Sequence, residues 1–150
     1  MTVSTTPEPD LSTWPTGRLL AVAARLVEHR WTAVLEGMGL THAGLIALHT
    51  LRDGPLPQRT LAQRCQVTDQ TISRTLDRLA KSGFVTRTQD PADARRHVTQ
   101  LTAQGRAVHE RAVRAEPAVL GDLGADDAFR AGLLQVIARL SAADRDQPVT

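Results

Sequence analysis

The stretch 60–102 constrains the fold more than any other part of this chain, because two short helical patterns are followed there by two strand-like segments. The first helical pattern covers 60–65, and Thr60 is expected to cap its free N–H groups. The second covers 68–82, where apolar side chains recur every three or four positions and predict a helix with one buried face. Only two residues separate the patterns, and the second, Val67, is expected to point inward. This order and spacing predict a helix-turn-helix.

The outer face of the second helix carries side chains suited to reading DNA. Glutamine pairs with adenine edges, arginine with guanine edges or phosphate, and the threonine methyl group with thymine. An ordinary solvated helix face explains the same residues, so this helix alone leaves both interpretations open. Helical geometry separates the two faces. The inward set is Ile72, Leu76 and Leu79, and the outward set is Gln70, Thr71, Arg74 and Arg78.

The residues after this helix favour the DNA interpretation. Gly83 is expected to end the helix in a left-handed conformation. Segments 84–88 and 97–101 alternate like strands, and 89–96 between them is expected to be a loop with two acids and two arginines. A β-hairpin directly after a recognition-type helix is a winged helix. Its tip is long enough to reach a minor groove, where narrow A·T segments attract arginine.

The spacing of these residues resembles the signature of the multiple antibiotic resistance regulator (MarR) family of transcription factors. In that signature a helix ends in Leu-x-x-x-Gly, a wing contains Asp-x-Arg, and a return strand closes on Leu-Thr-x-x-Gly. The matching residues are Leu79-Ala-Lys-Ser-Gly83, Phe84-Val85, Arg87, Asp93-Ala-Arg95 and Leu101-Thr-Ala-Gln-Gly105. The resemblance extends from about Leu19 to Leu140.

The resemblance implies a mainly α-helical fold with a small β-wing. A winged helix-turn-helix lobe would join a helical dimerisation core formed by the N- and C-terminal helices. The implied function is a homodimeric regulator that binds a pseudo-palindromic operator in double-stranded DNA, most simply a repressor released by a small ligand. The alternative is a winged-helix module that docks proteins without reading DNA. Arginines on both helix and wing disfavour it, because protein-docking faces expose apolar anchors.

Within the second helix, Thr68 and Ser73 are expected to contact phosphates. Gln70, Thr71 and Arg74 are expected to read base edges. Arg78 ranks lower, because Asp77 or a neighbouring acid is expected to hold it.

In the wing, the resemblance matches Asp93 to the acid that braces the wing arginine. It matches Arg95 to the arginine that enters the minor groove, with Arg96 assisting at the backbone. Ala94 stands where the family commonly has a basic residue, which removes one expected phosphate contact.

The resemblance also implies a site for a small aromatic or phenolic anion between the dimer core and the lobe. Candidate residues are Trp31, His42, His49 and Arg52, which offer ring faces and cationic or donor groups. Simple packing and solvation explain these four residues equally well.

Outside the winged helix, the chain divides into segments by their apolar patterns. Thr41 and Thr102 are expected to cap helices, as is Ser12 or Thr13, and Pro117 is expected to end or kink the helix that starts at Thr102. The segments are a disordered arm (1–12), N-terminal helices for dimerisation and support (13–54), the DNA-binding lobe (55–102), C-terminal dimerisation helices (103–143) and a frayed tail (144–150).

Charge follows this division. Residues 55–105 carry eight basic and four acidic side chains, a net charge of +4 in a chain whose total is +2, so the remainder is −2. Positive charge therefore gathers where nucleic acid would bind. The chain has only four Phe or Trp residues and no Tyr, too few for the stacking platforms of a single-stranded nucleic-acid binder.

Other chemistries find little support. The five histidines lack metal-ligand spacing and are interpreted as scattered surface residues, so no metal or cofactor is expected. The single thiol, Cys65, is interpreted as structural. No nucleophile elbow or phosphate-cradling loop is present, so an enzyme is not expected. The sequence shows neither a signal peptide nor a membrane span, which predicts a cytoplasmic protein.

Overall fold

The computed structural model describes residues 10–145. The fold is mainly α-helical with a small antiparallel sheet, as predicted. The elements in chain order are α1 (Thr16–Glu36), α2 (His42–Thr50), β1 (Leu56–Pro57), α3 (Gln58–Arg64), α4 (Asp69–Lys81), β2 (Val85–Asp90), β3 (Asp93–Leu101), α5 (Ala103–Leu120), the 3₁₀ helix η1 (Gly121–Ala125) and α6 (Asp127–Arg145).

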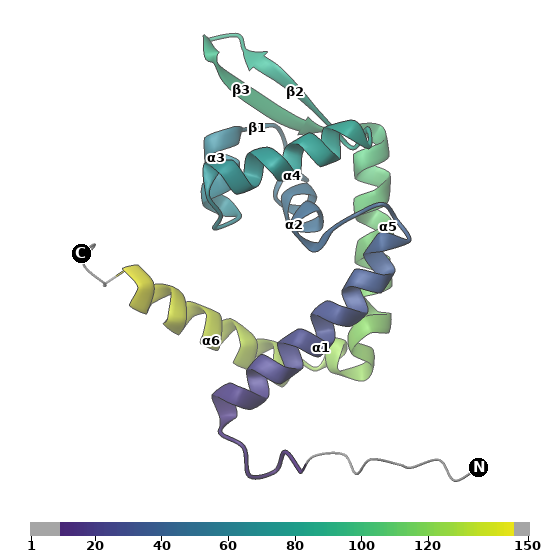
Figure 1. The fold of residues 1–150 in the computed structure, drawn as a ribbon, viewed down its shortest axis with the longest axis vertical. Coiled ribbons are helices and arrows are strands. Elements are labelled where there is room, and N and C mark those ends of the chain that lie inside the picture. Colours follow the sequence, from purple (N-terminus) through teal and green to yellow (C-terminus); the bar gives the residue numbers. More distant parts are fainter. Residues whose placement is uncertain (1–9, 146–150) are drawn as a thin grey trace.

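The elements gather at the two ends of α5. Helices α2, α3 and α4 and the sheet form a lobe at one end, whereas α1 runs along the other part of α5 and α6 departs from its far end (Figure 1). The predicted disordered arm and frayed tail fall largely outside the described residues. Among the described residues, no helix is both long and apolar enough to cross a membrane.

Three threonines cap helices, and two of these caps, Thr41 and Thr102, were predicted. The side-chain oxygens of Thr41, Thr68 and Thr102 each accept the backbone N–H three residues on, at 3.0–3.1 Å. Each bond satisfies one of the donors that a helix start leaves free.

Two other predicted caps are wrong, and a proline explains each. Helix α3 begins at Gln58, two residues earlier than predicted, with Pro57 as its N-cap, so Thr60 lies inside the first turn. Helix α1 begins directly after Pro15, so neither Ser12 nor Thr13 caps it. Both prolines have φ near −60°, which leads the chain directly into a helix without a capping side chain.

The lobe is closed around a dense apolar core. Leu48, Leu51, Leu61, Ile72 and Leu76 are each at most 2% exposed, and they come from α2, α3, α4 and the loop after α2. The inward face predicted for α4 is therefore confirmed.

The turn before α4 differs from its predicted form. Val67 is 37% exposed, so the prediction of an inward anchor is wrong. Gln66 has φ of 56°, a left-handed conformation that reverses the chain within two residues and turns the Val67 side chain outward.

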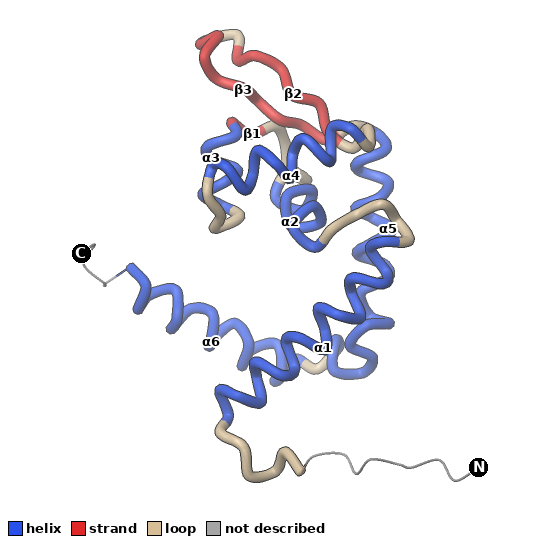
Figure 2. Tube along the Cα trace, in the orientation of Figure 1, coloured by secondary structure: helices blue, strands red, loops and turns tan. Residues whose placement is uncertain are grey.

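The sheet has strand order β1-β3-β2, and the wing is longer than predicted. The short edge strand β1 pairs with β3, and its Leu56 lies opposite Thr99. Strands β2 and β3 stay paired out to Asp90 and Asp93, so most of the predicted 89–96 loop is hairpin (Figure 2). Polar side chains on both exposed faces of the wing hide this pairing from hydrophobic patterning.

The recognition-type helix, the wing and α5 meet at one junction. The Thr102 hydroxyl donates to the Gly83 carbonyl at 2.6 Å, and the Thr102 N–H donates to the Phe84 carbonyl at 3.1 Å. Gly83 has φ of 78°, which confirms the predicted left-handed helix end. A Cβ on Gly105 would lie 1.9 Å from the Phe84 carbonyl oxygen, so α5 starts this close to the wing base only because residue 105 is glycine.

Helix α5 passes through Pro117 and continues to Leu120, so of the two predicted outcomes, an end or a kink at Pro117, the end is wrong. Proline removes one backbone donor, but tertiary contacts hold the turn beyond it. Val119 is buried, and its carbonyl accepts from Nη1 of Arg30 on α1 at 3.3 Å. The helix ends just before Gly121, where φ is 58°.

Candidate nucleic-acid interface

The polar face of α4 is open to solvent. The residues predicted to read bases are all exposed, as are Thr68 and Arg78, whereas Ser73 is half-buried. The predicted base-reading residues are Gln70, Thr71 and Arg74.

Two threonines at the start of α4 are hydrogen-bonded to each other. The Thr68 hydroxyl donates to the Thr71 hydroxyl at 2.9 Å and accepts the Thr71 N–H at 3.1 Å. Thr75, one turn on, donates from its hydroxyl to the Thr71 carbonyl at 3.0 Å. The exposed hydroxyls are thereby fixed, and each keeps free acceptor capacity.

The prediction that Asp77 holds Arg78 is wrong. Asp77 instead accepts a hydrogen bond from Arg87 on β2, which ties α4 to the wing. Arg78 lines a cavity of about 270 Å³ together with Gly39 and Thr41. It therefore lies towards the loop between α1 and α2, away from the start of α4.

The wing arginines lie on strand β3, not in a loop. Arg95 and Arg96 are both exposed. The Asp93 carboxylate accepts the backbone N–H of Arg95 at 3.0 Å, so it fixes the chain at the arginine. Asp90 accepts the N–H of Ala92 at 2.9 Å and closes the tip.

A cleft joins the wing to both helices of the helix-turn-helix. Its volume is about 370 Å³, and three arginines and one acid are among its lining residues. Sequence reasoning predicted only Arg95 and Arg96 of its residues, and Arg59 and His97 are the basic or titratable side chains that it missed. Arg59 is the second residue of α3, two positions after the edge strand β1, and the pairing of β1 with β3 is the signal that places it beside the wing. The lining is Pro57, Gln58, Arg59, Asp69, Arg95, Arg96 and His97.

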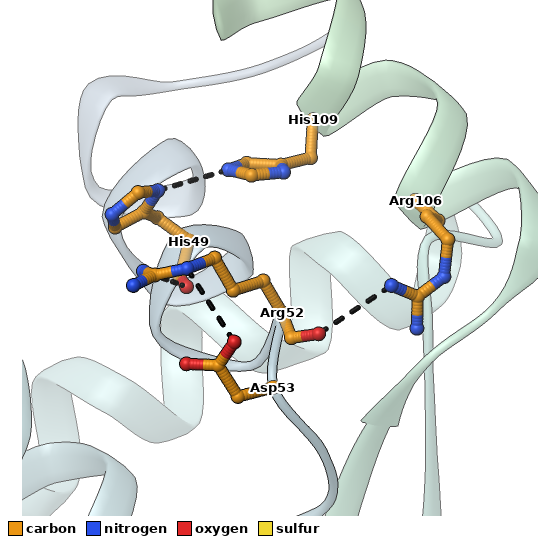
Figure 3. A network of polar contacts seen from close by, with 5 residues as sticks. All are labelled: His49, Arg52, Asp53, Arg106 and His109. Atoms are coloured by element: carbon orange, nitrogen blue, oxygen red, sulfur yellow. Dashed lines mark hydrogen bonds and ion pairs between the residues drawn. The ribbon is translucent and has the colours of Figure 1, made fainter.

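The candidate ligand residues occupy different environments. Trp31 is buried and His42 is exposed. His49 and Arg52 do come together, because Nη1 of Arg52 donates to the His49 carbonyl at 3.0 Å (Figure 3). Cavities of about 270, 370, 410 and 100 Å³ in the described part of the chain are lined by other residues than these four.

One histidine departs from the scattered surface interpretation. His109 on α5 is only 7% exposed, and its Nε2 lies 3.0 Å from Nδ1 of His49. Burial lowers the pKa of His109 below its ordinary value of 6.5, and the nearby His49 and Arg52 lower that pKa further. No spacing in the sequence signals this contact, since the two residues are 60 positions apart.

The geometry of the described residues gives no support for a metal site or for a reactive thiol. Within residues 10–145, no three His, Cys, Asp or Glu side chains gather closely enough to hold a metal ion. Cys65 is half-buried, and its Sγ lies 3.5 Å from the Thr50 hydroxyl.

Comparison with known proteins gives relatives of one kind. A family model described as MarR family matches residues 38–96. The HTH-type transcriptional repressor Rv2887 of Mycobacterium tuberculosis is 33% identical over 129 residues, which cover 85% of this chain and 84% of that protein.

Solved structures agree with the sequence comparisons. The PcaV transcriptional regulator from Streptomyces coelicolor, solved in complex with its natural ligand, has a TM-score of 0.72 and 26% identity, covering 92% of this chain and 99% of that chain. The transcriptional regulator MosR of M. tuberculosis, solved in complex with DNA, has a TM-score of 0.72 and 27% identity, covering 87% of this chain and 96% of that chain. This chain belongs to the MarR family of winged-helix transcriptional regulators.

Proposed function

We propose that this regulator is a homodimeric repressor that binds a pseudo-palindromic operator and releases it when a small ligand binds. The observation that carries the DNA part is the exposed polar face of α4 beside an arginine-lined cleft. A helix of this kind fits the major groove while the wing follows the backbone to the next minor groove. MosR, a structural relative, has been solved with DNA.

Residues of α4 divide the work of binding. Gln70, Thr71 and Arg74 read base edges from the exposed face. Thr68 and Ser73 contact phosphates at the edge of that face. Arg78 is a weaker contact, since it points towards the cavity beside Gly39.

The wing adds a minor-groove contact. Arg95 enters the groove, its backbone held by Asp93, and Arg96 contacts the phosphate backbone. Replacement of Arg95 by alanine should weaken binding and reduce its salt dependence. If the loss is no greater for A·T-flanked than for G·C-flanked sites, Arg95 does not enter the minor groove.

Exposed apolar side chains on the terminal helices support the homodimer. Leu134, Ile137 and Leu140 of α6 are 54–61% exposed, and Leu26 of α1 is 61% exposed. A cavity of about 410 Å³ lies among the end of α5, η1 and α6. Two-fold symmetry would place the half-sites roughly 10 bp apart.

The ligand would bind between the dimer core and the lobe. A ligand shifts DNA affinity only through different affinities for two lobe arrangements, so its site must border both parts. Of the candidates Trp31, His42, His49 and Arg52, the last two lie together near α5. PcaV, another structural relative, has been solved with its natural ligand.

A gel-shift assay against the DNA upstream of the protein's own gene tests the DNA part. The wild type should bind, and Arg74→Ala should lose about 1–3 kcal/mol of binding free energy with relaxed sequence preference. Arg111→Ala, which removes an exposed arginine on α5 outside the lobe, is the matched control. Formation of a dimer that binds no DNA would favour the protein-docking alternative.

Thermal-shift screening of phenolic acids, urate-like heterocycles and antibiotics tests the ligand part. A true effector should stabilise the protein by mass action and release DNA over the same concentration range. Stabilisation without release would contradict this part of the proposal.

A further inference from the structure

Two histidines meet across the contact between the lobe and α5. Nδ1 of His49, near the end of α2, lies 3.0 Å from Nε2 of His109 on α5, and the ring centroids are 5.2 Å apart (Figure 3). His109 is 7% exposed, whereas His49 is exposed. Helix α2 also packs against α4, so this pair lies on the route from α5 to the DNA-reading helix.

The number of protons on the pair decides whether the hydrogen bond exists. A neutral imidazole has one donor and one acceptor nitrogen, so one ring donates to the other. A pair with one extra proton keeps the bond, because the charged ring still donates to the neutral one. A pair with two extra protons loses it, since two N–H groups and two positive charges then face each other.

The surroundings oppose charge on the pair. Nη1 of Arg52 donates to the His49 carbonyl, and Nη1 of Arg106 on α5 donates to the Arg52 carbonyl at 3.4 Å. Two acids act in the other direction: Asp53 lies 3.6 Å from Nε of Arg52, and Glu110 favours the charged form of His109. Helix α1 packs against both α2 and α5. Its Arg30 donates a hydrogen bond to the Val119 carbonyl, farther along α5.

We propose that the His49–His109 pair makes the attachment of the lobe to α5 sensitive to protons. In mildly acidic solution the second proton breaks the hydrogen bond and the rings separate. Helix α2, which packs against α4, then loses one fixed contact with α5. The consequence for DNA affinity rests on the proposed function, but the consequence for the fold does not.

The direction of the effect follows from linkage. The pKa of His109 is lowered in the folded protein, first by burial and then by the charges of His49 and Arg52. The unfolded chain therefore takes up the proton first as pH falls below 6.5. The contribution to stability is complete above pH 6.5 and is lost as pH falls towards the lowered pKa.

Urea unfolding of the full chain between pH 7.5 and 5.5 is the first test. As the pH falls, the unfolding equilibrium constant of the wild type should rise about fivefold more than that of His109→Gln, about one ordinary hydrogen bond. The control is His29→Gln, which removes an exposed histidine of α1 and should keep the wild-type profile. Parallel profiles for wild type and His109→Gln would overturn the proposal.

An NMR titration of the histidines is the second test. It uses the wild-type protein alone, so it does not depend on whether a variant folds. The pKa of His109 should lie below its ordinary value of 6.5. The ring resonances of His49 should respond as His109 takes up its proton, because the two rings share a hydrogen bond. A pKa of His109 at or above 6.5, with no response at His49, would overturn the proposal.

DNA affinity, measured by fluorescence anisotropy in a His97→Gln background, gives the functional readout. This background removes the wing histidine that lines the cleft with Arg95 and Arg96. Affinity should fall about fivefold from pH 7.5 to 5.5, by loss of one hydrogen bond, but not when His109→Gln is added. An equal fall in both proteins overturns the link to DNA. Absence of binding by the wild type at pH 7.5 sinks the proposed function, while the urea and NMR results still decide the role of the pair.

Discussion

The winged lobe and the terminal helices bury their apolar side chains in different ways. In the lobe, leucines from three helices meet in one closed core, and Leu48, Leu61 and Leu76 are fully buried. On α6, the apolar stripe is nearly all exposed, with Ile137 at 58%. Both regions are amphipathic, so the sequence pattern does not distinguish them. The core of the lobe continues to the inner faces of α1 and α5, where Leu35 and Ala112 are also buried. The difference indicates that this core is completed within the chain, whereas the exposed stripe of α6 has no such cover among the described residues.

The largest expected effect separates the two cores directly. Leu76→Ala should lower the free energy of unfolding by about 2–5 kcal/mol, because it leaves a cavity in a closed core. Leu140→Ala, on the 61% exposed end of α6, should have a much smaller effect at low protein concentration. Urea unfolding at two protein concentrations measures both variants. Equal losses would mean that the two regions share one core.

A glycine pair sharpens the comparison at the level of the backbone. Gly105→Ala should cost about 3 kcal/mol, since the added Cβ meets the Phe84 carbonyl oxygen. Gly132→Ala on α6 is the matched control, because nothing lies within 4 Å of its new Cβ. That control should be neutral or stabilising, as alanine is the better helix former. Thermal unfolding that ranks Gly132→Ala as the more damaging change would refute this reading.

A charged residue in the exposed apolar stripe of α6 should weaken the proposed self-association of the protein. Ile137→Asp should weaken the dimer by about 2 kcal/mol, because an unpaired carboxylate would enter an apolar interface. The control is Arg139→Ala. Arg139 is exposed, follows Ile137 by two positions and lies outside the apolar stripe, so this change should leave association unchanged. Sedimentation over a range of concentrations measures both. A wild-type monomer at micromolar concentration would leave the stripe without its proposed partner.

The smallest expected effect concerns a polar atom in the lobe. Thr99 is 0% exposed, and its hydroxyl has no hydrogen-bond partner among residues 10–145. Thr99→Val should therefore stabilise the fold by about 1 kcal/mol, because it removes an unsatisfied group with little change in shape. Thr75→Val should do the reverse, since the Thr75 hydroxyl donates to the Thr71 carbonyl. Chemical denaturation of the two variants gives the sign of each change.

Local interactions were the part of the fold that the sequence predicted best. Thr41 and Thr102 cap their helices as predicted, because each bond spans only three residues. Thr60 failed as a cap because the helix starts just after Pro57, where proline already sets the backbone. Hydrophobic periodicity correctly predicted that Leu76 is buried, but it did not predict the length of the wing. The ends of β2 and β3 near the wing tip have no buried face, so they show no hydrophobic alternation.

Contacts between distant elements were the part that the sequence could not predict. Asp77 pairs with Arg87 on the next element, although Arg78 is its neighbour in sequence. Helix α5 passes through Pro117 because α1 holds the turn beyond it, a contact that spans 89 positions. Arg59 and His109 acquire their surroundings in the same way, from segments that fold against them.

The junction at Thr102 has a consequence for how such regulators diversify. The wing leaves and rejoins the lobe at one point, where Thr102 contacts both Gly83 and Phe84. The wing tip is thereby a module with its entry and exit fixed together. Residues between Gln89 and His97 are free to change in length and charge while α4 and α5 keep their mutual orientation. If the wing and α4 contact DNA as proposed, selection can alter operator preference at the tip separately from the coupling between α5 and α4.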